Sequence, residues 1–171
     1  MANPLLDLGP CVIDYDGGTV VFNKSLGGVK FRYQEFNAPI KEDQSGSETD
    51  VDEVSTGAKC ELEVPLTREE LADLNYLLGN SAQVGTYLKA SNPVGESKFA
   101  GAVALIVKPI INGTVSVTTT QWLTIHRASP TVNWDVAYDN SGQRVFLTTF
   151  KGFPDDASGQ VGEFWRAGPD A

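Results

Sequence analysis

Two segments of the chain alternate between apolar and polar residues. In "VKFRYQE" (29–35) the apolar residues are Val29, Phe31 and Tyr33, and "AKCELEV" (58–64) repeats the pattern. Successive side chains of a β-strand point to opposite faces, so each segment predicts a strand with one face in a core and the other in water. If the two strands pair, a basic row meets a mostly acidic row, and such cross-strand charge pairs help to fix the register.

An acidic stretch, "EDQSGSETDVDEVSTG" (42–57), lies between these two strands. It contains no basic residue and six carboxylates, which belong to Glu42, Asp43, Glu48, Asp50, Asp52 and Glu53. The stretch lacks the spacing of a calcium-binding EF-hand loop, which needs a glycine at its sixth position and a glutamate at its twelfth. It therefore predicts a long hairpin loop at about residues 38–57 that is solvated or contacts a partner.

One segment, "PLTREELADLNYLLGN" (65–80), has the periodicity of an amphipathic helix. Leucines recur at three- and four-residue spacing, which places them on one stripe. Thr67 and Glu70 have the spacing of a capping box. We expect a helix at about residues 67–78 that packs one side against a core.

Further strands are predicted on both sides of this helix. "CVIDYDGGTVVF" (11–22) reads as a short hairpin, because "DGG" tolerates the positive φ of a tight turn. After the helix, "AGAVALIVKP" (100–109) predicts a buried strand, and "QWLTIHR", "TVNWDVAY" and "RVFLTTFKGF" predict three more, separated by turns at "ASP" and "DNSGQ". The sum is seven or eight strands in one mainly β domain, residues 1–171. The expected fold is a β-sandwich or a partly closed β-barrel with one flanking α-helix.

The charge of the chain limits its partners. Its 22 acidic and 13 basic residues give a net charge of −9, which repels nucleic acids and anionic membranes at long range. The sequence contains no signal-peptide pattern and no apolar run long enough for a membrane span, so we expect synthesis in a cytoplasm and no membrane contact. Cys11 and Cys60 lack CxxC spacing and fall in apolar runs, which predicts buried, reduced thiols.

Catalytic motifs are missing from the sequence. His126 is the single histidine and stands outside any nucleophile motif, and no GxSxG, HExxH or P-loop pattern occurs. We therefore expect a protein that is not an enzyme and needs no cofactor or metal.

The order of several short segments resembles one known family. They are, in chain order, "GPC", "LGGVKFRYQEF", "DQSGS", "VSTGAKCELEVPLTREELADLNYLL" and "TIHRASP…VFLTTFKGFPD". Together they resemble the tail tube protein, or major tail protein, of long-tailed bacteriophages, across nearly the whole chain. The resemblance also implies a fold similar to the tube protein of type VI secretion.

The resemblance implies a structural virion protein that assembles into stacked, hexameric rings. The rings form a hollow tail tube through which the genome passes without specific binding, in contact with tape-measure, tail-terminator and baseplate proteins. The acidic loop would then contact a neighbouring subunit or ring. The wall of the lumen would be the polar face of the long hairpin, which comprises Lys30, Arg32, Gln34, Lys59, Glu61 and Glu63.

Two other readings remain open. The first is a β-sandwich binding module without catalytic activity, in which Trp122, Trp134 and Trp165 form an aromatic platform for a sugar. The second is another virion component, a head-decoration or tail-terminator protein, since such proteins share similar β-folds.

Overall fold

The computed structural model describes residues 10–41, 48–67, 71–78, 81–92, 94–134, 144–157 and 161–169. Within these ranges the protein is mainly β, with one short α-helix, as the sequence predicts. Its elements are β1 (Cys11–Tyr15), β2 (Val20–Phe22), β3 (Lys30–Lys41), β4 (Asp50–Leu66), α1 (Leu71–Leu77), β5 (Ser81–Val84), β6 (Tyr87–Ala90), β7 (Val103–Ile111), β8 (Thr114–Val115), a 3-10 turn (Thr119–Gln121), β9 (Leu123–Val132), β10 (Phe146–Phe153) and β11 (Trp165–Ala167).

Nine of these strands form one antiparallel sheet. Its order is β2-β1-β7-β9-β10-β4-β3, with β8 attached to β7 and β11 attached to β9, while β5 and β6 form a separate hairpin. The order ends in β2 on one side and β3 on the other, and no pairing among the described residues joins these ends. The sheet is therefore not closed, and the expectation of a partly closed barrel is wrong.

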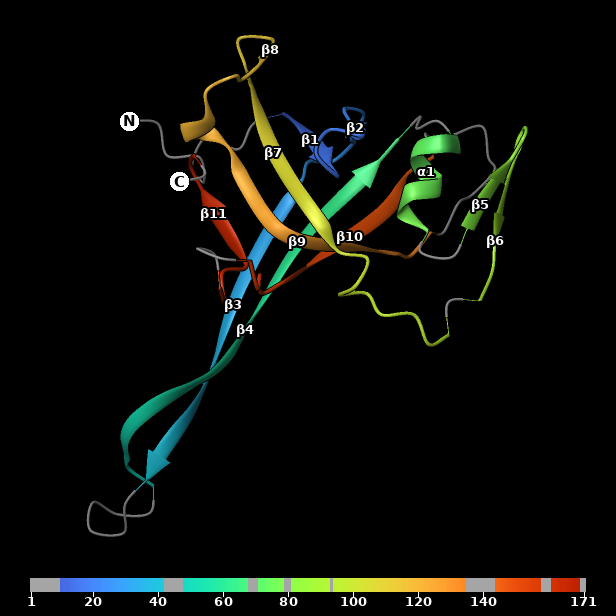
Figure 1. Ribbon diagram of the computed structural model, residues 1–171. Coiled ribbons are helices and arrows are strands. Elements are labelled where there is room, and N and C mark those ends of the chain that lie inside the picture. Colours follow the sequence, from blue (N-terminus) through green and yellow to red (C-terminus); the bar gives the residue numbers. More distant parts are fainter. Residues whose placement is uncertain are drawn as a thin grey trace.

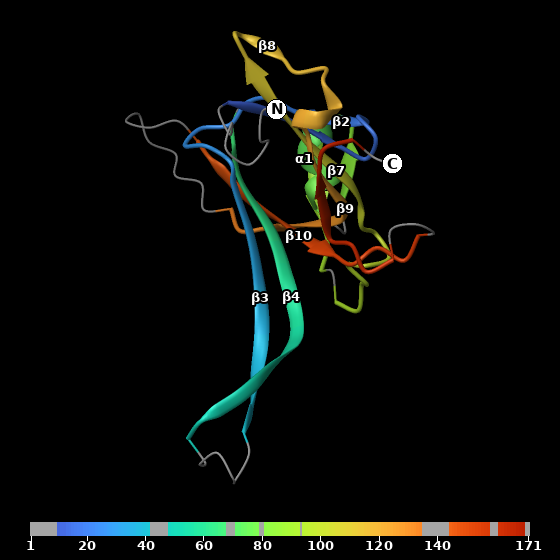
Figure 2. The same ribbon diagram turned by 90° about the vertical axis from the view of Figure 1, so that its left-hand side faces the viewer.

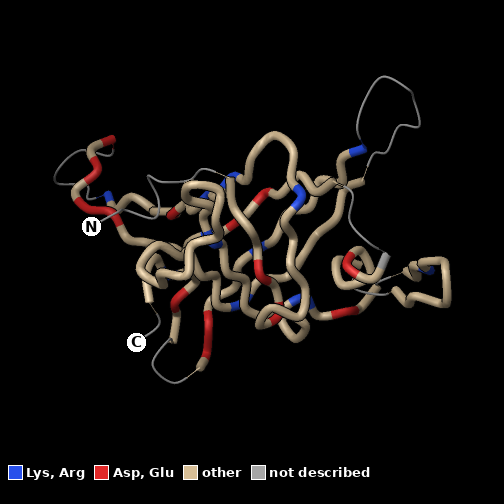
Figure 3. The backbone as a smooth tube through the Cα atoms, turned by 90° about the horizontal axis from the view of Figure 1, so that it is seen from above, with Lys and Arg blue, Asp and Glu red and all other residues tan. Residues whose placement is uncertain are grey.

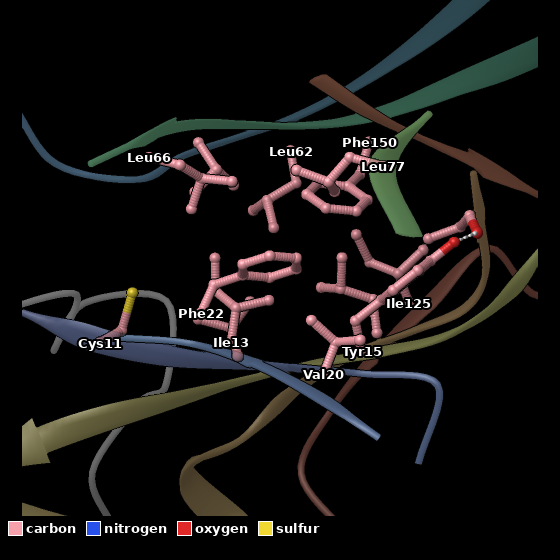
Figure 4. Packing of buried hydrophobic residues seen from close by; sticks show 14 of the residues in the cluster. Cys11, Ile13, Tyr15, Val20, Phe22, Leu62, Leu66, Leu77, Ile125 and Phe150 are labelled. Atoms are coloured by element: carbon pink, nitrogen blue, oxygen red, sulfur yellow. Dashed lines mark hydrogen bonds between the residues drawn. The ribbon is translucent and has the colours of Figure 1, made fainter. Parts of the chain in front are cut away.

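The core lies where two parts of this sheet face each other. Figure 4 shows side chains of β1 and β2, among them Ile13 and Phe22, pointing toward Leu62 and Leu66 of β4 and Phe150 of β10. All five are at most 2% exposed. The alternation of "AKCELEV" accounts for this side of the core, because Cys60, Leu62 and Val64 share one face of β4 and are buried.

Strand β9 connects the two parts and differs from the prediction. The sequence predicts a turn at "ASP", but Ala128, Ser129 and Pro130 are buried within one continuous strand. The end of β9 at Leu123–Ile125 pairs with β7 and β11, whereas Arg127–Val132 pairs with β10. Pairing with β7 stops at Ala128, so Pro130 lies where β9 has a neighbour on one side only, and its missing N–H is tolerated there.

The helix α1 covers one end of this core. It spans Leu71–Leu77, buries Leu74 and Leu77, and lies against β2, β5, β6 and β9 (Figure 1). Thr67, where the helix is expected to begin, lies outside α1, and its hydroxyl donates a hydrogen bond to the backbone oxygen of Lys24. Residues 68–70, which include the second capping residue Glu70, lie outside the described part. The apolar stripe of the sequence is thus confirmed for the two leucines that reach the core.

The predicted loop at 38–57 is mostly strand. Residues 38–41 and 50–57 continue β3 and β4, so the hairpin stays paired up to Lys41 and Asp50. Residues 42–47, which include Glu42 and Asp43, lie outside the described part. Figures 1 and 2 show this hairpin projecting far beyond the rest of the molecule. We call residues 36–41 and 50–57 the arm, and residues 30–35 and 58–66 the base.

Candidate functional site

The polar side of the hairpin base has the predicted register. Lys30 is the cross-strand partner of Glu63, Arg32 of Glu61, and Gln34 of Lys59. The Lys30 Nζ lies 3.8 Å from a Glu63 carboxylate oxygen. The predicted pairing of a basic row with a mostly acidic row is therefore confirmed.

Strand β10 extends this polar surface with a residue that the sequence analysis missed. Lys151 is the partner of Glu61, and Thr149 is the partner of both Glu63 and Thr131. The alternation of "RVFLTTFKGF" assigns Lys151 to a polar face, but only the pairing of β10 with β4 places it beside Glu61. We use the term polar face for Lys30, Arg32, Gln34, Lys59, Glu61, Glu63, Thr131, Thr149 and Lys151.

A groove of about 560 Å³ runs over part of this face. Its lining comes from β3, β4, β9 and β10 and from one residue just after β9, and it comprises Lys30, Phe31, Arg32, Glu61, Glu63, Thr131, Asn133, Thr149 and Lys151. The whole polar face has four cations, on Lys30, Arg32, Lys59 and Lys151, and two carboxylates, on Glu61 and Glu63, which leaves an excess of two positive charges. This face is therefore locally basic although the chain carries −9 overall.

The ion pairs on the polar face leave two of its cations unmatched. Lys30 contacts Glu63, and Lys59 contacts Glu61 at 2.9 Å. No carboxylate in the described ranges lies within 4 Å of the charged groups of Arg32 or Lys151. The groove thus presents these two cations together with the hydroxyls of Thr131 and Thr149, which suits an anionic group.

The arm has apolar side chains, but they are exposed and do not belong to a core. Alternation along β3 places Phe36, Ala38 and Ile40 on the same side as Lys30 and Arg32. Phe36 is 44% exposed, and Val54, the partner of Ala38, is 49% exposed. The register shifts after Phe36 and again after Ile40, so the arm contains two irregularities of the β-bulge kind. Every described residue of the arm is exposed.

The end of the arm is acidic, as the sequence predicts. Figure 3 shows Asp and Glu gathered there, on the left of the view. The Lys41 Nζ lies 3.7 Å from a carboxylate oxygen of Glu48 and 3.8 Å from one of Asp50. Lys41 therefore balances part of the negative charge at this end. No described cation lies within 4 Å of Asp52 or Glu53.

The outer edge of β3 is unpaired. β3 is the last strand of the sheet, and among the described strands it pairs with β4 alone. Up to the first register shift this edge runs for seven residues, Lys30–Phe36, or roughly 23 Å of strand. Open N–H and C=O groups on such an edge are able to pair with another strand.

The opposite side of the base is covered by the C-terminal strand. The Trp165 ring lies 5.2 Å from the Phe31 ring and 5.8 Å from the Tyr33 ring, centroid to centroid. Trp134 instead contacts Phe146, and Trp122 lies under the Lys108 ammonium. Each tryptophan therefore packs against different neighbours, and the three do not share one contact surface.

His126 and the cysteines are buried. The His126 Nε2 lies 3.2 Å from a Glu163 carboxylate oxygen without forming a hydrogen bond, and Arg166 donates two hydrogen bonds to the same carboxylate. Both cysteines are buried free thiols, as predicted. Burial and the nearby Glu61 raise the pKa of Cys60 to about 12, and burial raises the pKa of Cys11. These thiols are protonated at neutral pH and poorly reactive.

The described ranges contain neither a cluster of metal-ligating side chains nor a helix that could span a membrane. Within them, no three side chains of His, Cys, Asp or Glu come close enough together to hold a metal ion. No helix of the described chain is both long enough and apolar enough for a transmembrane span.

The sequence matches no protein-family model and no curated protein. The surfaces described above are therefore the basis on which a function can be proposed.

Proposed function

We propose that this protein is a structural subunit that assembles with copies of itself through the edge of β3. The observation that carries the proposal is the open edge at Lys30–Phe36, next to an arm with no partner among the described residues. A long exposed edge is a hazard for a monomer, because any unpaired strand can join it. Side-by-side joining of copies in a closed ring removes the edge.

The assembly that we propose is the tail tube of a long-tailed bacteriophage. The mainly β fold, the single short helix and the long hairpin agree with the family that the sequence resembles. In this proposal the facing parts of the sheet are a β-sandwich, rings of subunits stack into a hollow tube, and the polar face lines the lumen. The protein is synthesised in the host cytoplasm and ends in the virion, where its tube joins tape-measure, tail-terminator and baseplate proteins.

Two features of the hairpin support this role. The register shifts at Phe36 and Ile40, together with Pro39, interrupt the ladder on the arm, so regular edge pairing is favoured along the base. The arm is then free for a different contact, and its exposed apolar side chains gain most from burial against a neighbour. A ring contact and a stacking contact would thus use different stretches of the same hairpin.

Negative-stain electron microscopy of the purified protein tests the proposal. The sample is concentrated and held at raised salt, where the repulsion between subunits of charge −9 is screened. Rings or tubes with a central hole are the expected result. A monomer that persists at every concentration and binds glycans would contradict the proposal in favour of a binding module, and single rings that never stack would favour a tail-terminator or head-decoration protein.

A further inference from the structure

Two surfaces of this chain carry unmatched charges of opposite sign. Arg32 and Lys151 in the groove lack a carboxylate within 4 Å, and Asp52 and Glu53 on the arm lack a cation within 4 Å, both within the ranges that the structure describes. Each surface is therefore able to bind a group with the chemistry of the other.

The two surfaces cannot meet within one molecule. On the paired hairpin Arg32 is opposite Glu61, whereas Asp52 is opposite Ile40, eight residues further along β3. Eight residues of strand span about 26 Å, and Figures 1 and 2 show the arm pointing away from the body. A contact between the arm's end and a groove therefore requires a second copy of the chain.

We propose that the acidic end of the arm of one copy docks in the polar-face groove of the next copy. The carboxylates of Asp52 and Glu53 then lie against Arg32 and Lys151, and the hydroxyls of Thr131 and Thr149 donate further hydrogen bonds. The groove, at about 560 Å³, has room for several side chains. Such a contact joins unlike surfaces, so it repeats from copy to copy and extends an assembly without closing it. The inference rests on the proposed function and names the contact that stacks one ring on the next.

The docked arm would also change the charge of the lumen. A free polar face has an excess of two positive charges, which would attract the phosphates of passing DNA. The two carboxylates of a docked arm balance them. A DNA duplex in the lumen then meets no cationic wall that would bind its phosphates, as a conduit requires.

Charge reversal on each surface tests the docking. The R32E/K151E variant changes the net charge from −9 to −13, and D52K/E53K changes it from −9 to −5. We expect each to raise the concentration required for assembly by about tenfold or more, measured by sedimentation velocity. Combining all four substitutions restores both the charge of −9 and the complementarity with reversed signs, and it should restore assembly. The control K89E/K98E also has a charge of −13, reverses two exposed lysines away from the groove, and should assemble like the wild type.

Two results would overturn the docking. One is R32E/K151E protein that assembles like the wild type, and the other is a combined variant that assembles no better than its two parents. If R32E/K151E assembles normally but loses binding of a short DNA duplex at low salt, the groove is a nucleic-acid surface instead.

Disulfide trapping tests the docking even if no ring or tube forms. In an R32C/D52C variant the two new thiols are too far apart to join within one chain, so oxidation can link them only between copies. We expect a ladder of linked multimers in a non-reducing gel, and far less of it from K89C/D52C. The native cysteines do not interfere, because both are buried. Equal ladders from the two variants would overturn the docking while leaving the proposed edge-to-edge assembly untouched.

Discussion

The base and the arm of the β3–β4 hairpin share one ladder of hydrogen bonds, but only the base contributes buried apolar side chains to the core, and these come from β4. In the base, Cys60 and Leu62 are each 1% exposed, whereas Phe36 and Val54 of the arm are 44% and 49% exposed. Both parts are paired in antiparallel fashion. Pairing alone therefore does not decide whether the apolar side of a hairpin is buried.

The difference comes from what lies beside the hairpin. β10 pairs with β4 from Cys60 to Leu66 and no further, and Trp165 of β11 covers Phe31 and Tyr33. Beyond these elements no described residue covers the arm. The base is thus part of the folding unit, while the arm is a surface that other molecules can contact.

Truncation in the base should have the largest effect on stability. Leu62→Ala removes a side chain from the middle of the core and should lower the free energy of unfolding by about 2 to 5 kcal/mol. The matched change on the arm, Val54→Ala, should alter it by no more than about 0.5 kcal/mol. Urea denaturation followed by circular dichroism measures both, and similar losses would show that the arm is also part of the core.

Replacement of Gly152, which lies behind the base, should have the second-largest effect on stability. A Cβ at Gly152 would lie 2.9 Å from the Cβ of Cys60 and 3.1 Å from Cγ2 of Ile125, so Gly152→Ala forces the core apart. We expect a loss of about 1 to 3 kcal/mol by urea denaturation. Gly101→Ala is the control, because no atom lies within 4 Å of a Cβ there. A Gly152→Ala variant as stable as this control would mean that β9 and β10 are not closely packed.

We expect the loop that leads to β11 to make the cover of the base sensitive to acid. Although burial opposes the shift, hydrogen bonds from the N–H groups of Ala157 and Asp156 and from Arg127 hold the pKa of Asp155 below its ordinary value of 3.8. A lowered folded-state pKa gives stability that is complete above the unfolded-state pKa and is lost as the pH falls through the folded-state pKa.

Replacement of this carboxylate tests the effect. At pH 7, Asp155→Asn should lower the free energy of unfolding by about 1 to 2 kcal/mol, because hydrogen bonds to a charged acceptor are lost. The deficit relative to the wild type should shrink when the same measurement is made below pH 3. A deficit that is equal at both pH values would show that the carboxylate charge does not hold this loop.

Several strands of this fold were readable from the sequence, but the short strands β5, β6, β8 and β11 and the extent of the hairpin were not. The strand predicted at "TVNWDVAY" is strand only at Thr131 and Val132, which end β9, and its residues from 135 onward lie outside the described part. Alternation at 29–35 and 58–64 predicts the base together with its register, since a slip by one residue would turn the apolar sides of the two strands to opposite faces of the sheet. The expected core face is confirmed for 58–64, whereas on β3 Phe31 is half-buried and Tyr33 is 38% exposed. On the arm no burial enforces alternation, and polar residues such as Asp52 and Glu53 resemble a loop. "ASP" likewise has turn composition, yet pairing with β10 carries β9 straight through it.

Only part of the candidate site could be predicted from the sequence. The charged residues of the hairpin could be assigned to one face, because they alternate with apolar residues in both of its strands. Lys151 and Thr131 come from strands distant in the sequence, and only tertiary pairing places them on that face. The groove, and the excess of positive charge in it, therefore could not be inferred before the sheet order was known.

The ion pairs on the polar side of the base should contribute little to stability. The Lys30 side chain is 68% exposed and lies 3.8 Å from Glu63, so water screens their attraction. Lys30→Ala should change the free energy of unfolding by about 0.5 kcal/mol or less, and a double-mutant cycle with Glu63→Ala isolates the pair. A coupling of several kcal/mol would mean that these charges stabilise the fold and are not free for a partner.

Removal of the arm should have the smallest effect on the fold and a large one on assembly. Asn37 and Ser55 are cross-strand partners, so an Asn-Gly turn in place of residues 38–54 can close the hairpin between them. Because the removed residues that the structure describes are all exposed, we expect the free energy of unfolding to change by no more than about 0.5 kcal/mol. Long tubes should no longer appear in the electron microscope, while rings joined along the base remain. A shortened protein that unfolds much more readily would make the arm part of the folding unit, and normal tubes would remove its role in stacking.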